Sequence, residues 1–87
     1  MKNPKTIHAM AFGSKGRDRF LSDMILKKVV NVNIFQCMKL CEGYGGRCRS
    51  FSVNEETKEC FLNAIKKEET AKGLFEFRKG FVYYELL

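Results

Sequence analysis

Short segments in which apolar and polar residues alternate occur along most of the chain, and such alternation is typical of half-buried strands. We expect strands at six places: residues 6–12, 24–30, 47–53, 59–64, 74–77 and 81–86. Glycine or polar residues between them predict turns at 13–16, 54–58 and 79–80, and the last of these turns would close a terminal hairpin.

One segment follows helical spacing instead. Four apolar residues recur at i, i+3, i+4 and i+7, and therefore share one helix face: Ile34, Cys37, Met38 and Cys41. Asn33 precedes this segment and Gln36 follows it by three residues, which is the pattern of a capping box. Gly43 is expected to end the helix. One helix among antiparallel strands predicts an α+β fold.

Size and composition narrow the class of protein. The chain has 87 residues, 45% of them hydrophobic, which suits one folded domain and excludes disorder. No apolar run approaches the roughly 18 residues of a membrane span, and the N-terminus has no apolar segment typical of a signal peptide. The single histidine, His8, has no acid or nucleophile beside it in the chain. We therefore expect a non-catalytic domain without a cofactor.

Four cysteines occupy the middle of the chain with the spacing C-x3-C-x6-C-x11-C: Cys37, Cys41, Cys48 and Cys60. Structural zinc sites usually bring together two close pairs of ligands, and only the first two cysteines form such a pair. We therefore predict two disulfides and no metal, which implies an oxidising compartment. Spacing alone leaves all three possible pairings open.

The net charge of +6 is unevenly distributed. Residues 1–50 carry ten basic and three acidic residues, a net +7, whereas residues 51–87 carry six and seven, a net −1. Such a one-sided positive charge attracts polyanions, although solvated charges without a ligand also fit. Arg47 and Arg49 alternate by two in an expected strand, and Lys27 and Lys28 lie on the connection into the helix. These four residues form the candidate polyanion-binding site.

Several features of the sequence occur together: the expected helix carries Cys37 and Cys41, Cys48 is followed three residues later by Phe51, Cys60 precedes Leu62, and residues 80–86 contain an expected aromatic strand. In these features the chain resembles the PAN/apple family. The resemblance covers about residues 5–86 of a single domain spanning 1–87. Apple domains proper have a third disulfide between their termini. This chain lacks that pair, so it is most similar to the four-cysteine type found at the N-termini of plasminogen and hepatocyte growth factor.

The resemblance implies a twisted antiparallel sheet of about five strands packed on a single α-helix. It also implies the nested pairing of Cys37 with Cys60 and of Cys41 with Cys48, and core positions for Phe51 and Leu62, to which the helical stripe adds Met38.

For function, the resemblance implies a secreted or cell-surface module that recognises or adheres to a protein or a carbohydrate, and the basic half favours a sulfated glycan such as heparin. Such a module would be part of a larger protein. A small secreted effector or inhibitor acting alone is an alternative. A basic nucleic-acid-binding domain is another, but oxidised cysteines argue against it.

Overall fold

The structure, a computed structural model, describes residues 12–71 and 73–87. Its strands are β1 (Phe12–Leu21), β2 (Ile25–Val30), β3 (Ser50–Asn54), β4 (Glu59–Asn63) and β5 (Phe75–Leu86). Its helix is α1 (Ile34–Glu42), and a single 3-10 turn spans Lys67–Glu69. None of the described helices is long and apolar enough to cross a membrane.

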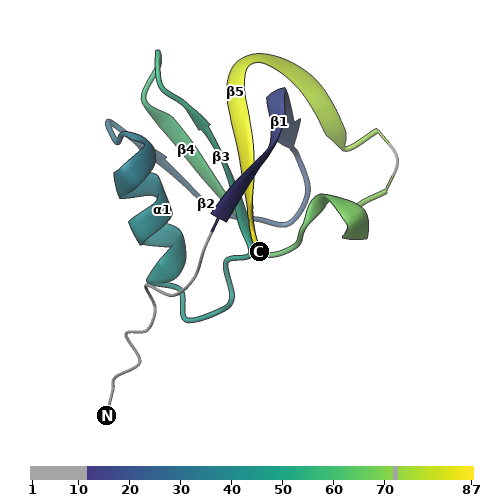
Figure 1. Cartoon of the computed structure of the whole chain (residues 1–87), viewed down its shortest axis with the longest axis horizontal. Coiled ribbons are helices and arrows are strands. Elements are labelled where there is room, and N and C mark those ends of the chain that lie inside the picture. The colour runs from purple at the N-terminus through teal and green to yellow at the C-terminus, as the bar shows by residue number, and fades with distance from the viewer. Residues whose placement is uncertain (1–11, 72) are drawn as a thin grey trace.

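The five strands form one antiparallel sheet in the order β1-β5-β3-β4-β2. Helix α1 packs against β3 and β4, the middle of the sheet, as Figure 1 shows. This arrangement confirms the α+β prediction of a five-stranded antiparallel sheet on one helix. Residues 6–11 of the first predicted strand lie outside the described residues.

Both faces of the sheet carry apolar side chains. The face toward α1 carries Phe51, Val53, Cys60 and Leu62, all at most 1% exposed. On the opposite face, the rings of Phe20, Phe61 and Phe81 meet edge to face, with centroids 4.8–5.9 Å apart. Phe20 belongs to β1 and Phe61 to β4. Strands β5 and β3 lie between these two strands in the sheet. Because neighbouring strands are about 4.8 Å apart, this contact requires a strongly curled sheet.

Two disulfides join α1 to the segments that follow it. Cys37 is bonded to Cys60 and Cys41 to Cys48, at sequence separations of 23 and 7, and we call these the wide and the tight disulfide. This is the nested pairing that the resemblance implies. All four cysteines are fully buried, whereas Met38 is half-buried and packs against the edge of the core.

The capping box of α1 is confirmed. The side chain of Asn33 accepts the backbone N–H of Gln36 at 2.9 Å, and the side chain of Gln36 accepts the backbone N–H of Asn33 at the same distance. The helix ends at Gly43, as predicted. The turn between β3 and β4 also lies where the polar residues predict it.

The predictions of a terminal hairpin and of a turn at residues 13–16 are wrong. Residues 13–16 lie inside β1, and residues 75–86 form one strand, β5, that pairs with β1 rather than with itself. Between the pairs Arg17–Val82 and Arg19–Phe77, one residue of β1 lies opposite four residues of β5. The extra residues form a bulge in which Gly80 has φ of +90°, so its glycine bends the strand instead of ending it.

Candidate functional site

The four predicted cations do not form one cluster. Lys27 and Lys28 lie within β2, not on the connection after it, and neighbouring residues of a strand project to opposite faces of the sheet. The ammonium of Lys28 lies 5.5 Å from the ring centroid of Phe61 and 3.5 Å from the carboxylate of Glu59. The charge of Lys28 is therefore partly neutralised, whereas Lys27 has no carboxylate partner among the described residues.

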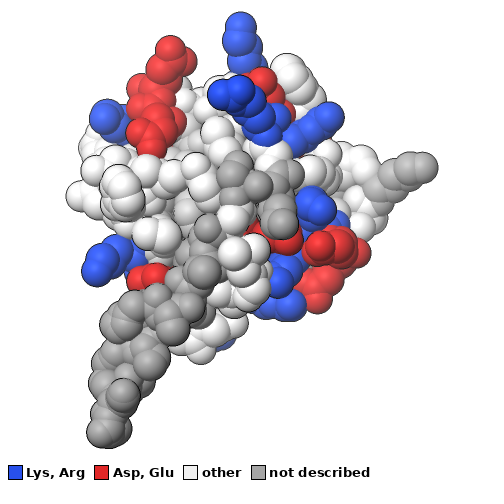
Figure 2. Space-filling view, viewed as in Figure 1, with Lys and Arg blue, Asp and Glu red and all other residues white. Residues whose placement is uncertain are grey.

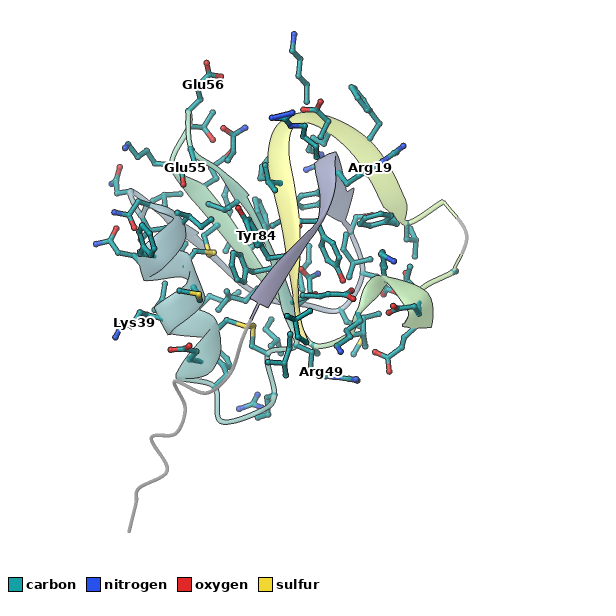
Figure 3. The ribbon with its side chains drawn as sticks, in the orientation of Figure 1. Arg19, Lys39, Arg49, Glu55, Glu56 and Tyr84 are labelled. Carbon is teal, nitrogen blue, oxygen red and sulfur yellow. A yellow bond between two sulfur atoms is a disulfide. The ribbon has the colours of Figure 1, made fainter. Side chains whose placement is uncertain are left out.

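Arg47 and Arg49 precede β3, so the expectation that they alternate on one strand is wrong. The tight disulfide holds Cys48 against α1, and β3 begins only at Ser50. The exposed guanidinium of Arg47 lies 5.6 Å from the ring centroid of Tyr44. Arg49, labelled in Figure 3, instead donates two hydrogen bonds to the carboxylate of Glu69, at 3.0 and 2.9 Å.

The surroundings of the Glu69 carboxylate favour its charged form. The backbone N–H of Lys66 donates to it at 2.9 Å and the Arg49 guanidinium lies beside it, and together they hold the pKa of Glu69 below its ordinary value. The positive charge of Arg49 is therefore neutralised by Glu69. Of the four predicted residues, Lys27 and Arg47 are the two whose charge is left for a ligand.

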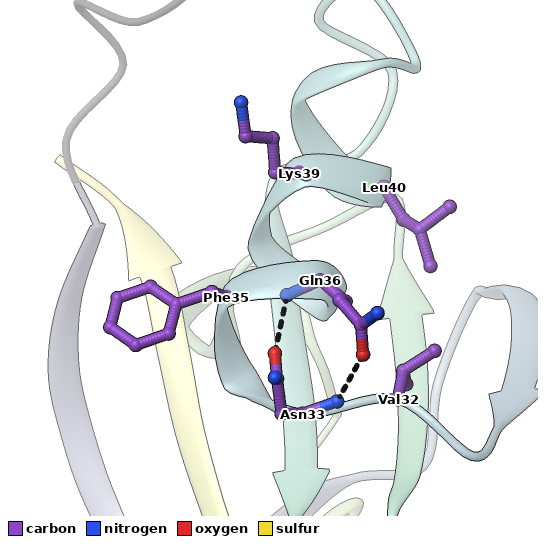
Figure 4. A pocket seen from close by; sticks show the side chains of 6 residues that line it. All are labelled: Val32, Asn33, Phe35, Gln36, Lys39 and Leu40. Atoms are coloured by element: carbon purple, nitrogen blue, oxygen red, sulfur yellow. Dashed lines mark hydrogen bonds between the residues drawn. The ribbon is translucent and has the colours of Figure 1, made fainter.

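The outer face of α1 carries a shallow groove that the sequence prediction did not include. It is lined by Val32, Asn33, Phe35, Gln36, Lys39 and Leu40, as Figure 4 shows. Phe35 is 69% exposed, although it is a large apolar side chain. The sequence signal for this face was present, because Phe35 and Leu40 lie off the stripe that carries the cysteines. The groove offers apolar contact beside one free cation, Lys39.

The structure also brings together a second group of cations that the sequence analysis did not predict as a group. Arg17 and Arg19 of β1 pair with Val82 and Phe77 of β5, and the bulge between these two partners contains Arg78 and Lys79. Figure 2 shows basic side chains gathered above this bulge, and Figure 3 labels Arg19 among them. The sequence separates Lys79 from Arg19 by 60 residues, so only the pairing of β1 with β5 reveals the group.

The buried polar residues of the sheet serve the fold. The hydroxyl of Tyr83 accepts the backbone N–H of Lys67 at 2.8 Å and donates to the Glu85 carboxylate at 3.1 Å, and burial raises the pKa of Tyr83. Within residues 12–71 and 73–87, no three His, Cys, Asp or Glu side chains are placed to hold a metal ion. His8 lies outside the described residues.

Comparison with known proteins gives a family. A family model described as the PAN domain matches residues 14–87, which include the helix and all of the strands except the first two residues of β1. No curated protein matches the chain. The matched region contains the two disulfides, α1 and the five-stranded sheet, in agreement with the resemblance found in the sequence. The chain belongs to the PAN domain family.

Proposed function

We propose that this chain is a non-catalytic, extracellular recognition module that binds a protein or a sulfated glycan and forms part of a larger secreted or cell-surface protein. PAN domains are modules of protein and carbohydrate interaction and are generally non-catalytic. The two disulfides support an extracellular location, since disulfides persist in oxidising compartments.

One observation carries the proposal: exposed cations without a carboxylate partner lie on elements that disulfides hold in place. Arg47 follows the helix end fixed by the tight disulfide, and Lys27 lies in β2, which pairs with the β4 strand of the wide disulfide. Rigid placement favours a polyanion, because several weak charge contacts at fixed positions add without a further cost in ordering. Lys28 and Arg49 stay in the proposal as contributors to the positive field only.

Retention on a heparin column tests the glycan ligand. We expect the oxidised protein to be retained at physiological salt and to elute at a defined higher salt concentration, since binding that neutralises anions releases their counterions. Passage of the protein through the column at physiological salt would exclude the sulfated glycan. The ligand would then be a protein, for which the groove with the exposed Phe35 offers an apolar surface.

The length of the precursor separates a module from a small effector acting alone. Sequencing the full transcript should show further domains encoded with this one. A precursor that encodes nothing beyond this domain and a secretion signal would instead support the effector.

A further inference from the structure

The bend of β5 over β1 is held in place from its inner side. We call Arg17–Phe20 of β1 together with Phe77–Phe81 of β5 the β1–β5 bend. The carboxylate of Asp18 accepts the backbone N–H of Gly80 at 2.8 Å, which ties the bulge of β5 to β1. The guanidinium of Arg78 lies 3.8 Å from the ring centroid of Phe20 and is paired with Glu76. Arg78 is exposed, but its guanidinium is engaged by Phe20 and Glu76.

The outward side of the same bend presents an aromatic ring beside cations. Arg78 contacts Phe20, and strand alternation directs the preceding residue, Phe77, to the other side of the strand. Lys79 lies in the bulge and is exposed. Arg19 is the cross-strand partner of Phe77, so their side chains project from the same side of the sheet. Phe77 is 65% exposed, and Arg19 and Lys79 are exposed as well.

The charge at this surface is positive and uncompensated. Arg17, Arg19 and Lys79 have no carboxylate within ion-pair distance among the described residues. Arg78 and Glu76 neutralise each other, so Asp18 is the one remaining acid of the bend, and it is engaged with Gly80. An anionic group at this surface would therefore meet Arg19, Lys79 and Arg17 near the exposed ring of Phe77.

We propose that the outward side of the β1–β5 bend is a binding subsite for an anionic saccharide. One face of a pyranose ring is made of C–H groups and packs on the exposed ring of Phe77, while its sulfate or carboxylate groups accept hydrogen bonds from Arg19 and Lys79. This subsite rests on the proposed function and specifies where the glycan binds.

An apolar ring among cations also suits an anionic membrane surface, but the structure favours the saccharide. Membrane-surface binding scales with the apolar area inserted, and Phe77 is the one large exposed apolar side chain of the bend. The bulge is moreover tied down by Asp18 and Arg78, which suits a ligand with groups at fixed spacing.

The test uses a size-defined heparin hexasaccharide, titrated by calorimetry into the oxidised protein and its variants. We expect Phe77→Ala to weaken binding about threefold to tenfold, in line with the contribution of an aromatic contact. Phe35→Ala is the matched control, because Phe35 is equally exposed but lies on α1. It should leave the affinity unchanged.

The cations are tested by variants of equal charge. Arg19→Gln/Lys79→Gln should weaken binding roughly tenfold. The plot of log affinity against log salt should also become less steep by about 1.4, which is twice the value of about 0.7 per neutralised charge on a flexible single-stranded polyanion. A control removes two charges elsewhere, Lys66→Gln/Lys67→Gln at the 3-10 turn, where neither residue has been given a role in binding. This control should show the smaller effect of net charge alone.

Each outcome has one reading. If the wild type fails to bind the hexasaccharide, the glycan ligand itself is wrong. If the wild type binds but the two Arg19/Lys79 and Phe77 variants behave like their controls, the subsite is wrong and the glycan function stands. Binding to phosphatidylserine vesicles that Phe77→Ala abolishes, with no hexasaccharide binding, would replace the saccharide by a lipid surface.

Discussion

Replacing Gly80 by alanine probes the bend of β5 directly. Gly80 has φ of +90°, a conformation that costs a residue with a Cβ atom roughly 1–2 kcal/mol. A Cβ atom at this position would also lie 2.8 Å from Nδ2 of Asn54. Asn54 cannot easily rotate away, because its Oδ1 accepts the backbone N–H groups of Glu56 and Thr57 at 2.9 and 3.1 Å.

Gly73 provides a matched control. Its φ is +94°, but nothing lies within 4 Å of the Cβ atom that alanine would add. Gly73→Ala should therefore lose about 1–2 kcal/mol of unfolding free energy, from the backbone alone. Gly80→Ala should lose about 2–5 kcal/mol, because overpacking adds roughly 1–3 kcal/mol. The difference between the two variants measures the close approach of the bend to the β3–β4 turn.

Urea denaturation at 25 °C, followed by circular dichroism, gives both free energies. Asn54→Ala removes the colliding side chain, so in that background the cost of Gly80→Ala should fall to that of Gly73→Ala, a coupling of about 1–3 kcal/mol. Equal losses for the two glycine variants in the wild-type background, or an absence of coupling to Asn54, would refute the packing of the bend described here.

Further predictions concern the core, the disulfides and the charge pair. Phe51→Ala should lose about 3–5 kcal/mol in the same assay, because its fully buried ring stacks on Tyr84 at 5.1 Å; an unchanged midpoint would place it at the surface. Replacing the cysteines of the wide disulfide by alanine should lose about 3.4 kcal/mol from loop entropy and those of the tight one about 2.5, so the reverse order would contradict this account. The folded-state pKa of Glu69 lies below the ordinary 4.5, so its stabilisation is present above that pH and is lost as pH falls through the lower value. Glu69→Gln should flatten the fall in stability below pH 4.5, and an identical pH profile would show that the pair contributes nothing.

Local sequence signals were sufficient to predict the helix and its buried face. The capping box involves two residues three positions apart, and its two hydrogen bonds form wherever the rest of the chain lies. The stripe with Cys37 and Cys41 identified the buried face for the same reason, since helical spacing alone decides which side chains share a face. The turn at 54–58 was similarly local.

The path of β5 could not be obtained from local signals. Lys79-Gly80 looks like a turn between two short strands, and glycine with positive φ suits either a turn or a bulge. The choice is made by β1, some 60 residues away, which pairs with both halves of β5 and supplies Asp18 to the bulge. Gly13 and Gly16 misled in the same way, because they lie inside a strand that has its own register shift.

The availability of each predicted cation could not be obtained from local signals either. Whether a cation is available depends on its carboxylate partner, and Arg49 finds Glu69 twenty residues further along the chain. Lys28 is paired with Glu59 across β2 and β4. Charge counting along the sequence ranks these residues with Arg19 and Lys79, although only the fold decides which charges are compensated.

The two exposed phenylalanines show how one domain can offer separate surfaces. Phe35 lies on the outer face of α1 beside Lys39, whereas Phe77 lies on β5 opposite Arg19 of β1. Figure 1 places α1 against the middle of the sheet and the bend at the end of β1, an edge strand. Among the described elements, α1 packs against β3 and β4, whereas the bend is formed by β1 and β5. Substitutions at one surface should therefore leave ligand affinity at the other unchanged, since distant sites without shared contacts behave additively.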